Sequence, residues 1–127
     1  MNDREPNSQV LLLDDDEDDY VLLKAMLREA FGDSVHLDWY QKDHVANGMI
    51  CSGIYNVSLV DYLLGKENGI DVIRKVKAEC PDQTLFLYTG FQHNPILERA
   101  IEAGADGYII KAELSIQKLE EILNPYL

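Results

Sequence analysis

The chain has 127 residues, which is enough for one domain around a single hydrophobic core. Apolar residues make up 46% of it, which excludes a disordered protein, and the formal net charge of -12 argues against direct binding to nucleic acid or to an anionic membrane surface. No apolar stretch is long enough to span a membrane, and the N-terminal MNDREPNSQ lacks the apolar core of a signal peptide, so we expect a cytoplasmic protein.

Short apolar runs predict five β-strands. Residues 1–8 are polar and include Pro6, which predicts a flexible tail before a domain over 9–127. The run QVLLLD is continuously apolar and stopped by acids, as is typical of a strand buried on both faces, whereas VHLDWY alternates in polarity like an edge strand. The predicted strands are 9–14, 35–40, 56–61, 84–90 and 107–111.

Helical periodicity separates these strands. Gly32 ends the first predicted helix, Pro95 pre-sets the backbone of the fourth, and Ser115 is the expected cap of the last. The first predicted helix carries its apolar side chains from Leu23 to Phe31; the others are 43–52, 68–79, 95–103 and the segment after Ser115. Alternating strands and helices predict a doubly wound α/β fold, with a five-stranded parallel sheet and helices on both faces.

Polar residues follow four of the five predicted strands. Asp14 and Asp15 come after the first, Asp61 ends the third, Thr89 lies at the end of the fourth, and Lys111 ends the fifth. In open α/β sheets, ligands bind beyond the carboxyl ends of the strands. We therefore expect these five side chains to form one site.

The residue types in this group favour phosphoryl chemistry. Carboxylates form an oxygen site that suits Mg²⁺, with Mn²⁺ as a substitute, and the strand ends offer no His or Cys for zinc. A metal ion with the ammonium of Lys111 leaves room for a phosphoryl group, to which Thr89 could donate a hydrogen bond. An aspartate can act as the nucleophile and form an acyl phosphate, while the cations offset the charge that develops.

These motifs resemble those of response-regulator receiver domains of two-component signalling. The resemblance runs from about Gln9 to Leu123 and is carried by LLLDDD, VDYLLGKENG, LYTG and GADGYIIK, with Gly69 eight residues after Asp61. It implies a flavodoxin-like fold with strand order 2-1-3-4-5. It also implies a phosphoprotein without conventional enzyme activity, which catalyses its own phosphorylation and slow dephosphorylation.

The resemblance implies a role for each site residue. Asp61 would accept the phosphoryl group from a phosphohistidine. Asp15 and Asp61 would bind Mg²⁺ directly, Asp14 would bind it through water, and the backbone carbonyl of Leu63 would complete the protein ligands. No other cofactor is implied.

The resemblance also implies a switch and partners. Thr89 and Lys111 would contact the phosphoryl oxygens, and movement of Thr89 would let Tyr108 turn inward. The surface of the fourth helix, fifth strand and fifth helix would then change shape. The implied partners are a histidine kinase or histidine phosphotransfer protein and a downstream effector protein or domain, with the chain itself a monomer or weak homodimer.

Three departures from the family pattern affect these expectations. Ala112 replaces the proline that usually follows the lysine in a cis peptide; because a cis bond to a non-proline residue costs about 3 kcal/mol, we expect a trans bond. Gly65 stands where many members have proline. Leu63 and Phe91, two residues beyond Asp61 and Thr89, are both apolar. Similar positions influence access of the hydrolytic water in the family, so the resemblance implies slow loss of the phosphoryl group.

Two other functions remain open from the sequence. Asp14 and Asp16 fit the Asp-x-Asp of an aspartate-nucleophile phosphohydrolase, although Asp18 stands where such enzymes have Thr or Val. A receiver that only docks, without phosphorylation, is the other alternative. An EF-hand fails because Asp19 occupies the position that requires Gly. The chain could be a single-domain regulator or a piece of a larger signalling protein.

The remaining acids and the cysteines have structural interpretations. Four acids, Asp16, Glu17, Asp18 and Asp19, are expected to be bystanders in the first turn of the following helix, whose positive end favours anions. Cys51 and Cys80 lack C-x-x-C spacing and are expected to be free thiols.

Overall fold

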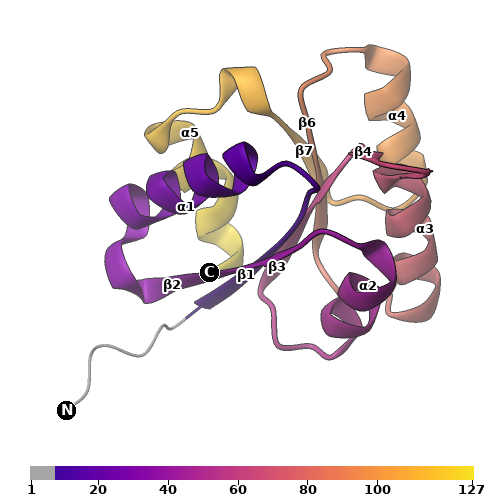
Figure 1. Ribbon diagram of the computed structural model, residues 1–127, viewed down its shortest axis with the longest axis horizontal. Helices are drawn as coiled ribbons and strands as arrows, with labels where there is room; N and C mark the ends of the chain where they lie inside the picture. Colours follow the sequence, from indigo (N-terminus) through magenta and orange to yellow (C-terminus); the bar gives the residue numbers. More distant parts are fainter. Residues whose placement is uncertain (1–7) are drawn as a thin grey trace.

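The computed structural model describes residues 8–127, which form one twisted parallel sheet between two layers of helices (Figure 1). Every pairing within this sheet is parallel, and the order agrees with the predicted 2-1-3-4-5 arrangement of the main strands. Across the sheet, the strands are β2 (Val35–Tyr40), β1 (Ser8–Leu13), β3 (Val57–Asp61), β6 (Leu85–Thr89) and β7 (Gly107–Ile110). The fold class expected from the sequence is confirmed.

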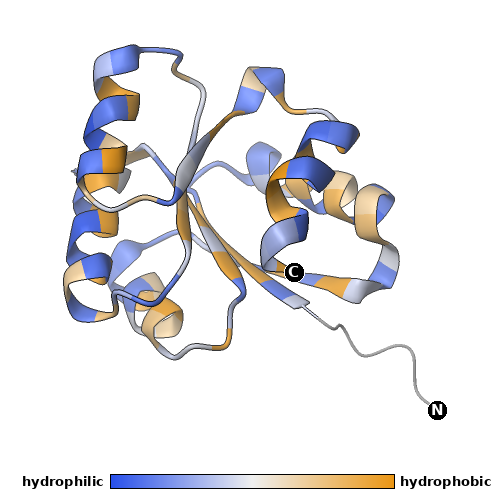
Figure 2. Ribbon diagram, turned by 180° about the vertical axis from the view of Figure 1, so that it is seen from behind, coloured by the Kyte–Doolittle hydropathy of each residue, from blue (hydrophilic) through white to orange (hydrophobic). Residues whose placement is uncertain are grey.

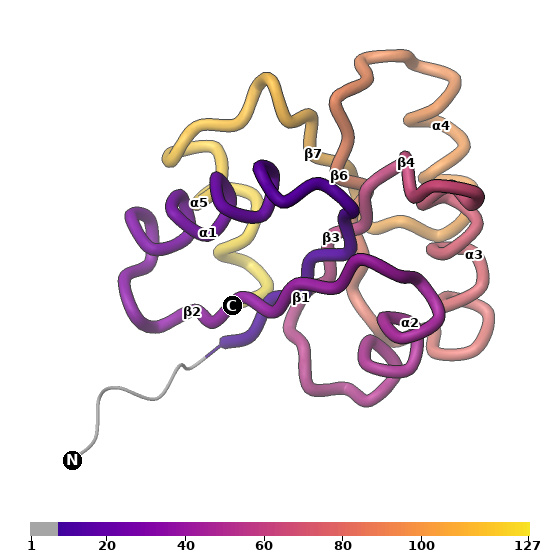
Figure 3. Tube along the Cα trace, in the orientation of Figure 1, coloured from indigo at the N-terminus to yellow at the C-terminus, as the bar shows by residue number. Residues whose placement is uncertain are grey.

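Helices cover both faces of the sheet (Figures 1 and 3). On one face lie α1 (Glu17–Phe31) and α5 (Ile116–Leu123); on the other lie α2 (Asp43–Cys51), α3 (Gly69–Glu79) and α4 (Asn94–Glu102). Short 3₁₀ turns η1 (Gly32–Ser34), η2 (Lys111–Glu113) and η3 (Asn124–Tyr126) complete the helical segments. In Figure 2 the helices carry hydrophobic and hydrophilic residues in alternating bands, as expected for helices that bury one side. Within residues 8–127, none of the helices combines the length and apolarity that a membrane crossing requires.

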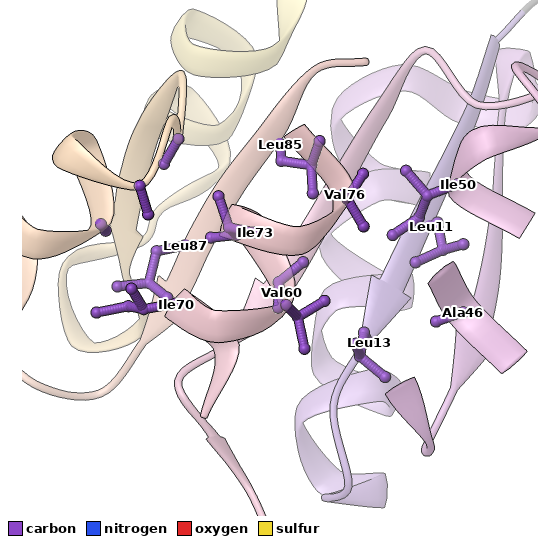
Figure 4. Close-up of a cluster of buried hydrophobic side chains, with 14 of the residues drawn as sticks. Leu11, Leu13, Ala46, Ile50, Val60, Ile70, Ile73, Val76, Leu85 and Leu87 are labelled. Carbon is purple, nitrogen blue, oxygen red and sulfur yellow. The ribbon is translucent and has the colours of Figure 1, made fainter. Parts of the chain in front are cut away.

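The hydrophobic core consists of two clusters, one on each face of the sheet. Figure 4 shows the larger one, in which α2, α3 and α4 pack against the central strands; it includes Leu11, Leu13, Val60, Ile73 and Leu87. The second cluster lies under α1 and α5 and includes Val10, Leu12, Leu23, Leu59 and Leu119. Alternate residues of β1 thus enter opposite clusters, which confirms that this strand is buried on both faces.

Two segments differ from the sequence predictions. β1 begins at Ser8, so the predicted tail is one residue too long; the rest of that tail, residues 1–7, lies outside the described residues. The loop after Asp61 contains a small antiparallel hairpin, β4 (Leu63–Leu64) and β5 (Glu67–Asn68). Gly65 turns this hairpin with φ +69°, a backbone conformation that proline cannot adopt.

The two cysteines form a disulfide, so the prediction of free thiols is wrong. Cys51 ends α2 and Cys80 follows α3, and their Cα atoms are 5.7 Å apart although 29 positions separate them in sequence. Because α2 and α3 are neighbours on the same face of the sheet, their C-terminal ends meet. Cysteine spacing carries no information about this helix packing.

We expect the disulfide to stabilise the fold by restricting the unfolded chain. Closing a loop of about 30 residues corresponds to about 3–4 kcal/mol in the chain-entropy description. Urea unfolding should therefore show a free energy of unfolding lower by about this amount after reduction, and equally lower in the double variant Cys51→Ser/Cys80→Ser. Reductant should leave the double variant unchanged, and two reactive thiols in the native, unreduced protein would contradict the assignment.

Candidate functional site

The parallel register brings the polar strand ends together at one edge of the sheet. Asp14 lies beside Asp61, each one residue past the last β1–β3 pair. Thr89 pairs with Ile110 in the β6–β7 ladder, so Lys111 follows directly beyond that pair. The structure therefore places these residues at a common edge, as the sequence predicted.

The ammonium of Lys111 is the centre of the site. Its Nζ donates hydrogen bonds to Asp19 Oδ2 at 2.6 Å, Asp14 Oδ2 at 3.1 Å and Asp61 Oδ1 at 3.2 Å. The side chain of Lys111 is 20% exposed, that of Asp14 is fully buried, and that of Asp61 is 8% exposed. A single cation thus offsets three carboxylates that water reaches poorly.

Burial makes the charges of this cluster interdependent. It raises the pKa of the Asp14 carboxyl and that of the Asp61 carboxyl above their ordinary values, and Lys111 opposes both shifts. Burial alone would lower the pKa of Lys111, but the hydrogen bond to Asp19 and the charges of Asp61 and Asp14 raise it above its usual range. The lysine is therefore held as an ammonium ion, and the carboxylates depend on a nearby cation to remain charged.

The acid run after β1 divides into three structural classes. Asp14 points into the site and accepts a hydrogen bond from the Asp16 backbone N–H at 2.9 Å. Asp16 in turn caps α1, because its side chain accepts from the Asp18 backbone N–H at 2.9 Å. Asp15, Glu17 and Asp18 are exposed to solvent. The run thus combines a buried carboxylate, a helix cap and solvated charges.

Asp19 belongs to the site, so its interpretation as a bystander is wrong. It makes the shortest of the three contacts with Lys111. With Asp16 as the cap, Asp19 is the third residue of α1, a position from which an acidic side chain can reach back toward the start of the helix. This spacing was the available signal, but nothing in the acid run 14–19 distinguishes Asp19 from its neighbours.

The remaining predicted ligands are not part of the carboxylate cluster. Asp15 is exposed, although its negative charge is close enough to contribute to the raised pKa of Asp61. Leu63 is paired with Asn68 in the β4–β5 hairpin, and its side chain is 55% exposed. Direct binding of a metal ion by Asp15 and by the Leu63 carbonyl stays a prediction.

The carboxylate cluster fits a hard divalent cation. Asp14, Asp19 and Asp61 each offer one carboxylate oxygen, and these atoms lie within 4.8 Å of one another. An all-oxygen set of this kind suits Mg²⁺ or Mn²⁺ rather than zinc. The same three carboxylates surround the Lys111 ammonium, so a metal ion and the lysine would use common partners.

Backbone contacts position the two innermost aspartates. A Cβ on Gly69 would lie 2.0 Å from the Asp61 carbonyl oxygen, so only glycine allows α3 to approach the strand end this closely. The Gly69 backbone N–H also donates to the Tyr62 carbonyl at 2.8 Å. At the other acid, Trp39 Nε1 donates to the Asp14 carbonyl at 2.7 Å.

Trp39 connects the edge strand to the site in a way that the sequence did not reveal. Its ring stacks on Tyr20 with centroids 4.6 Å apart and an interplanar angle of 7°. Trp39 is the single tryptophan of the chain. We therefore expect its fluorescence to respond to changes at the backbone of Asp14.

The two predicted switch residues, Thr89 and Tyr108, differ in their exposure to solvent. Thr89 is fully buried, and its Oγ1 accepts a hydrogen bond from the Phe91 backbone N–H at 3.0 Å. Tyr108 is 42% exposed.

Residues 8–127 contain no cis peptide bond, so the link from Lys111 to Ala112 is trans, as predicted.

Comparison with known proteins identifies the family. The family model for the response regulator receiver domain matches residues 10–124. The chain belongs to this family.

The sequence relatives of this receiver domain carry names that denote different functions. A cyclic di-GMP phosphodiesterase of Thermotoga maritima is 32% identical over 105 residues, which cover 80% of this chain and 26% of that protein. The transcriptional regulatory protein ZraR of Salmonella typhimurium is 29% identical, with 93% of this chain and 26% of that protein covered. The chemotaxis protein CheY of Halobacterium salinarum is 28% identical, with 81% and 83% covered. The chain spans about a quarter of the first two relatives.

Solved receiver structures share the fold. The signal receiver domain of an HD domain-containing protein from Pseudomonas fluorescens Pf-5 has a TM-score of 0.81 at 21% identity, covering 100% of this chain and 90% of that one. The beryllofluoride-activated NtrC4 receiver domain dimer has a TM-score of 0.80 at 24% identity, covering 93% and 94%.

We expect Lys111→Met to destabilise the receiver domain when divalent cations are absent. The substitution leaves the carboxylates of Asp14, Asp19 and Asp61 without their cation, and breaking a buried ion pair costs about 3 kcal/mol. Urea unfolding in EDTA should show this loss, and added Mg²⁺ should reverse part of it. The exposed Lys66→Met is the control; a change in Lys111→Met as small as in this control, under about 0.5 kcal/mol, would contradict the account.

Proposed function

We propose that this receiver domain is phosphorylated on Asp61 in a Mg²⁺-dependent reaction, with the phosphoryl group supplied by a phosphohistidine. The observation that carries the proposal is the convergence of three carboxylates on the ammonium of Lys111 around Asp61. Such a cluster can bind a divalent cation and retains an amine for a transferred anion. Phosphoryl transfer requires these positive charges around its acceptor.

Asp61 is the proposed nucleophile because its carboxyl group is nearly buried and next to the amine of Lys111. One carboxylate oxygen forms the bond to phosphorus as the phosphorus–nitrogen bond of the donor imidazole breaks. The departing imidazole nitrogen takes a proton from water, and the product is an aspartyl phosphate. Burial disfavours the carboxylate form, so Lys111 contributes by keeping Asp61 ionised.

The proposed ligands of Mg²⁺ are Asp14, Asp15, Asp61 and the Leu63 carbonyl. When bound, the metal supplies positive charge that offsets the phosphoryl oxygens. Lys111 supplies the second positive charge, and the direction of its pKa shift keeps it protonated. Thr89 Oγ1 accepts the hydrogen bond from the Phe91 backbone N–H, so its hydroxyl could still donate a hydrogen bond to a phosphoryl oxygen.

The proposed output is a change in the surface formed by α4, β7 and α5. Tyr108, on β7, is exposed and lines a cavity of about 230 Å³ together with Asn94, Leu97 and Ile101 of α4. Movement of Thr89 toward the phosphoryl group would free space for Tyr108 to turn inward. A charge event at the strand ends would thereby bias a two-state surface.

The proposed partners follow from membership of the receiver-domain family. A histidine kinase or a histidine phosphotransfer protein would supply the phosphoryl group, and an effector protein or domain would bind the altered surface. The receiver is proposed to occupy essentially the whole chain, from the first strand to residue 127. A cytoplasmic location, and the slow loss of the phosphoryl group suggested by Leu63 and Phe91, stay predictions.

We expect acetyl phosphate with Mg²⁺ to add one phosphoryl group to the protein. Intact-mass measurement should show the adduct in wild type and in Asp18→Asn, which removes an exposed neighbouring acid, but not in Asp61→Asn. The adduct should be acid-stable and base-labile, as expected of an acyl phosphate.

Three outcomes would contradict this assignment. An adduct that persists in Asp61→Asn would place the acceptor elsewhere. Turnover of phosphate esters that is lost in Asp14→Asn would instead favour an aspartate-nucleophile phosphohydrolase. A protein that forms no adduct, and no beryllofluoride complex, would act as a docking receiver only.

A further inference from the structure

The contact between Asp19 and Lys111 differs from the other two contacts of the ammonium. Asp14 and Asp61 lie at strand ends, whereas Asp19 comes from the first turn of α1. The Asp19 contact is the shortest, at 2.6 Å, against 3.1 Å and 3.2 Å for the strand-end carboxylates. The Asp19 side chain is also the most exposed of the three, at 25%.

A divalent cation would compete with Lys111 for the strand-end carboxylates. The proposed metal site uses Asp14 and Asp61, and both already accept hydrogen bonds from Lys111 Nζ. A doubly charged ion and an ammonium repel each other at short range, so they cannot share these oxygens without cost. Lys111 must give up at least part of this contact when the metal binds.

We propose that Asp19 is a positioning residue that retains the Lys111 ammonium in the pocket when the metal takes Asp14 and Asp61. This role rests on the proposed function. The ammonium has three N–H donors, one for each carboxylate, so yielding two contacts leaves its shortest one intact. Asp19 thereby lowers the cost of metal binding and keeps the amine beside the phosphoryl acceptor.

The ring of Tyr88 supports the retained position. Lys111 Nζ lies 5.1 Å from the centroid of this ring, within the range of a cation–π interaction. Tyr88 is buried, and burial raises the pKa of its hydroxyl to about 12, so the ring stays neutral. Asp19 and Tyr88 together provide a place for the ammonium that does not use the strand-end oxygens.

Asp19 could instead bind the metal itself, since its carboxylate lies near those of Asp14 and Asp61. The two roles differ in their dependence on the lysine. If Asp19 acts through Lys111, it matters only while the lysine is present. If Asp19 is a ligand, it matters equally without the lysine. A double-mutant cycle separates these possibilities.

The test measures Mg²⁺ affinity of the full chain by Trp39 fluorescence, with calorimetry as a second readout. Asp19→Asn should weaken Mg²⁺ binding about fivefold, the loss expected from one partly buried ion pair. Lys111→Met should strengthen it about tenfold because the competing cation is gone. The double variant should bind within about twofold of Lys111→Met, since Asp19 then has no lysine to hold. Asp18→Asn is the matched control and should bind within about twofold of wild type.

Each other outcome is decisive. A loss that persists when Asp19→Asn is made in the Lys111→Met background would show that Asp19 binds the ion and would overturn the positioning role. Equal affinities for Asp19→Asn and Asp18→Asn would overturn it too, while leaving the proposed function intact. Absence of any Mg²⁺ response in wild type would contradict the proposed function and the positioning role together.

A measurement without metal on the folded variants gives a second, independent readout. The ammonium signal of Lys111 in ¹⁵N-lysine NMR spectra should be shifted from those of exposed lysines in wild type, and should move toward them in Asp19→Asn. An unchanged signal in Asp19→Asn would show that Asp19 does not hold the lysine and would overturn the proposal.

Discussion

The site depends on one ion cluster, in which a single lysine ammonium donates hydrogen bonds to three carboxylates. Acids placed this close together and away from water repel each other and lose hydration, so they need a cation to remain charged. Lys111 supplies that cation from the far end of the chain, 97 residues beyond Asp14. The cluster therefore joins the first strand, the first helix and the third strand to the residue that follows the last strand.

The fold supports this cluster through its backbone. Parallel strands in the observed register end together, which places Asp14 beside Asp61 and brings Lys111 to the same edge. Gly69 allows α3 to pass close behind Asp61, and the indole of Trp39 donates to the carbonyl of Asp14. These contacts hold the two strand-end acids through their backbone carbonyls, and the Asp14 carboxylate is held in addition by the Asp16 backbone N–H.

The strand ends and the site residues on them were predictable because the hydrophobic pattern of the sequence marks the strands, and the order of strands and helices along the chain indicates a parallel sheet. An apolar run that stops at Asp61 marks the end of a buried strand, and parallel strands share one edge. Asp19 and the Cys51–Cys80 disulfide were missed because both depend on how helices pack. The orientation of the first turn of α1 decides which acid reaches Lys111, and the packing of α2 on α3 decides which thiols meet. Neither leaves a periodic signal in the sequence.

Anomalous scattering from crystals grown with Mn²⁺ would locate the cation most directly. The expected result is one strong peak beside the carboxylate of Asp61 and the acids that follow β1, with Lys111 still hydrogen-bonded to Asp19. This peak would also show whether Asp15 is a direct ligand. The account would be contradicted if crystals grown at saturating Mn²⁺ showed no peak at this edge of the sheet while Lys111 still contacted all three carboxylates.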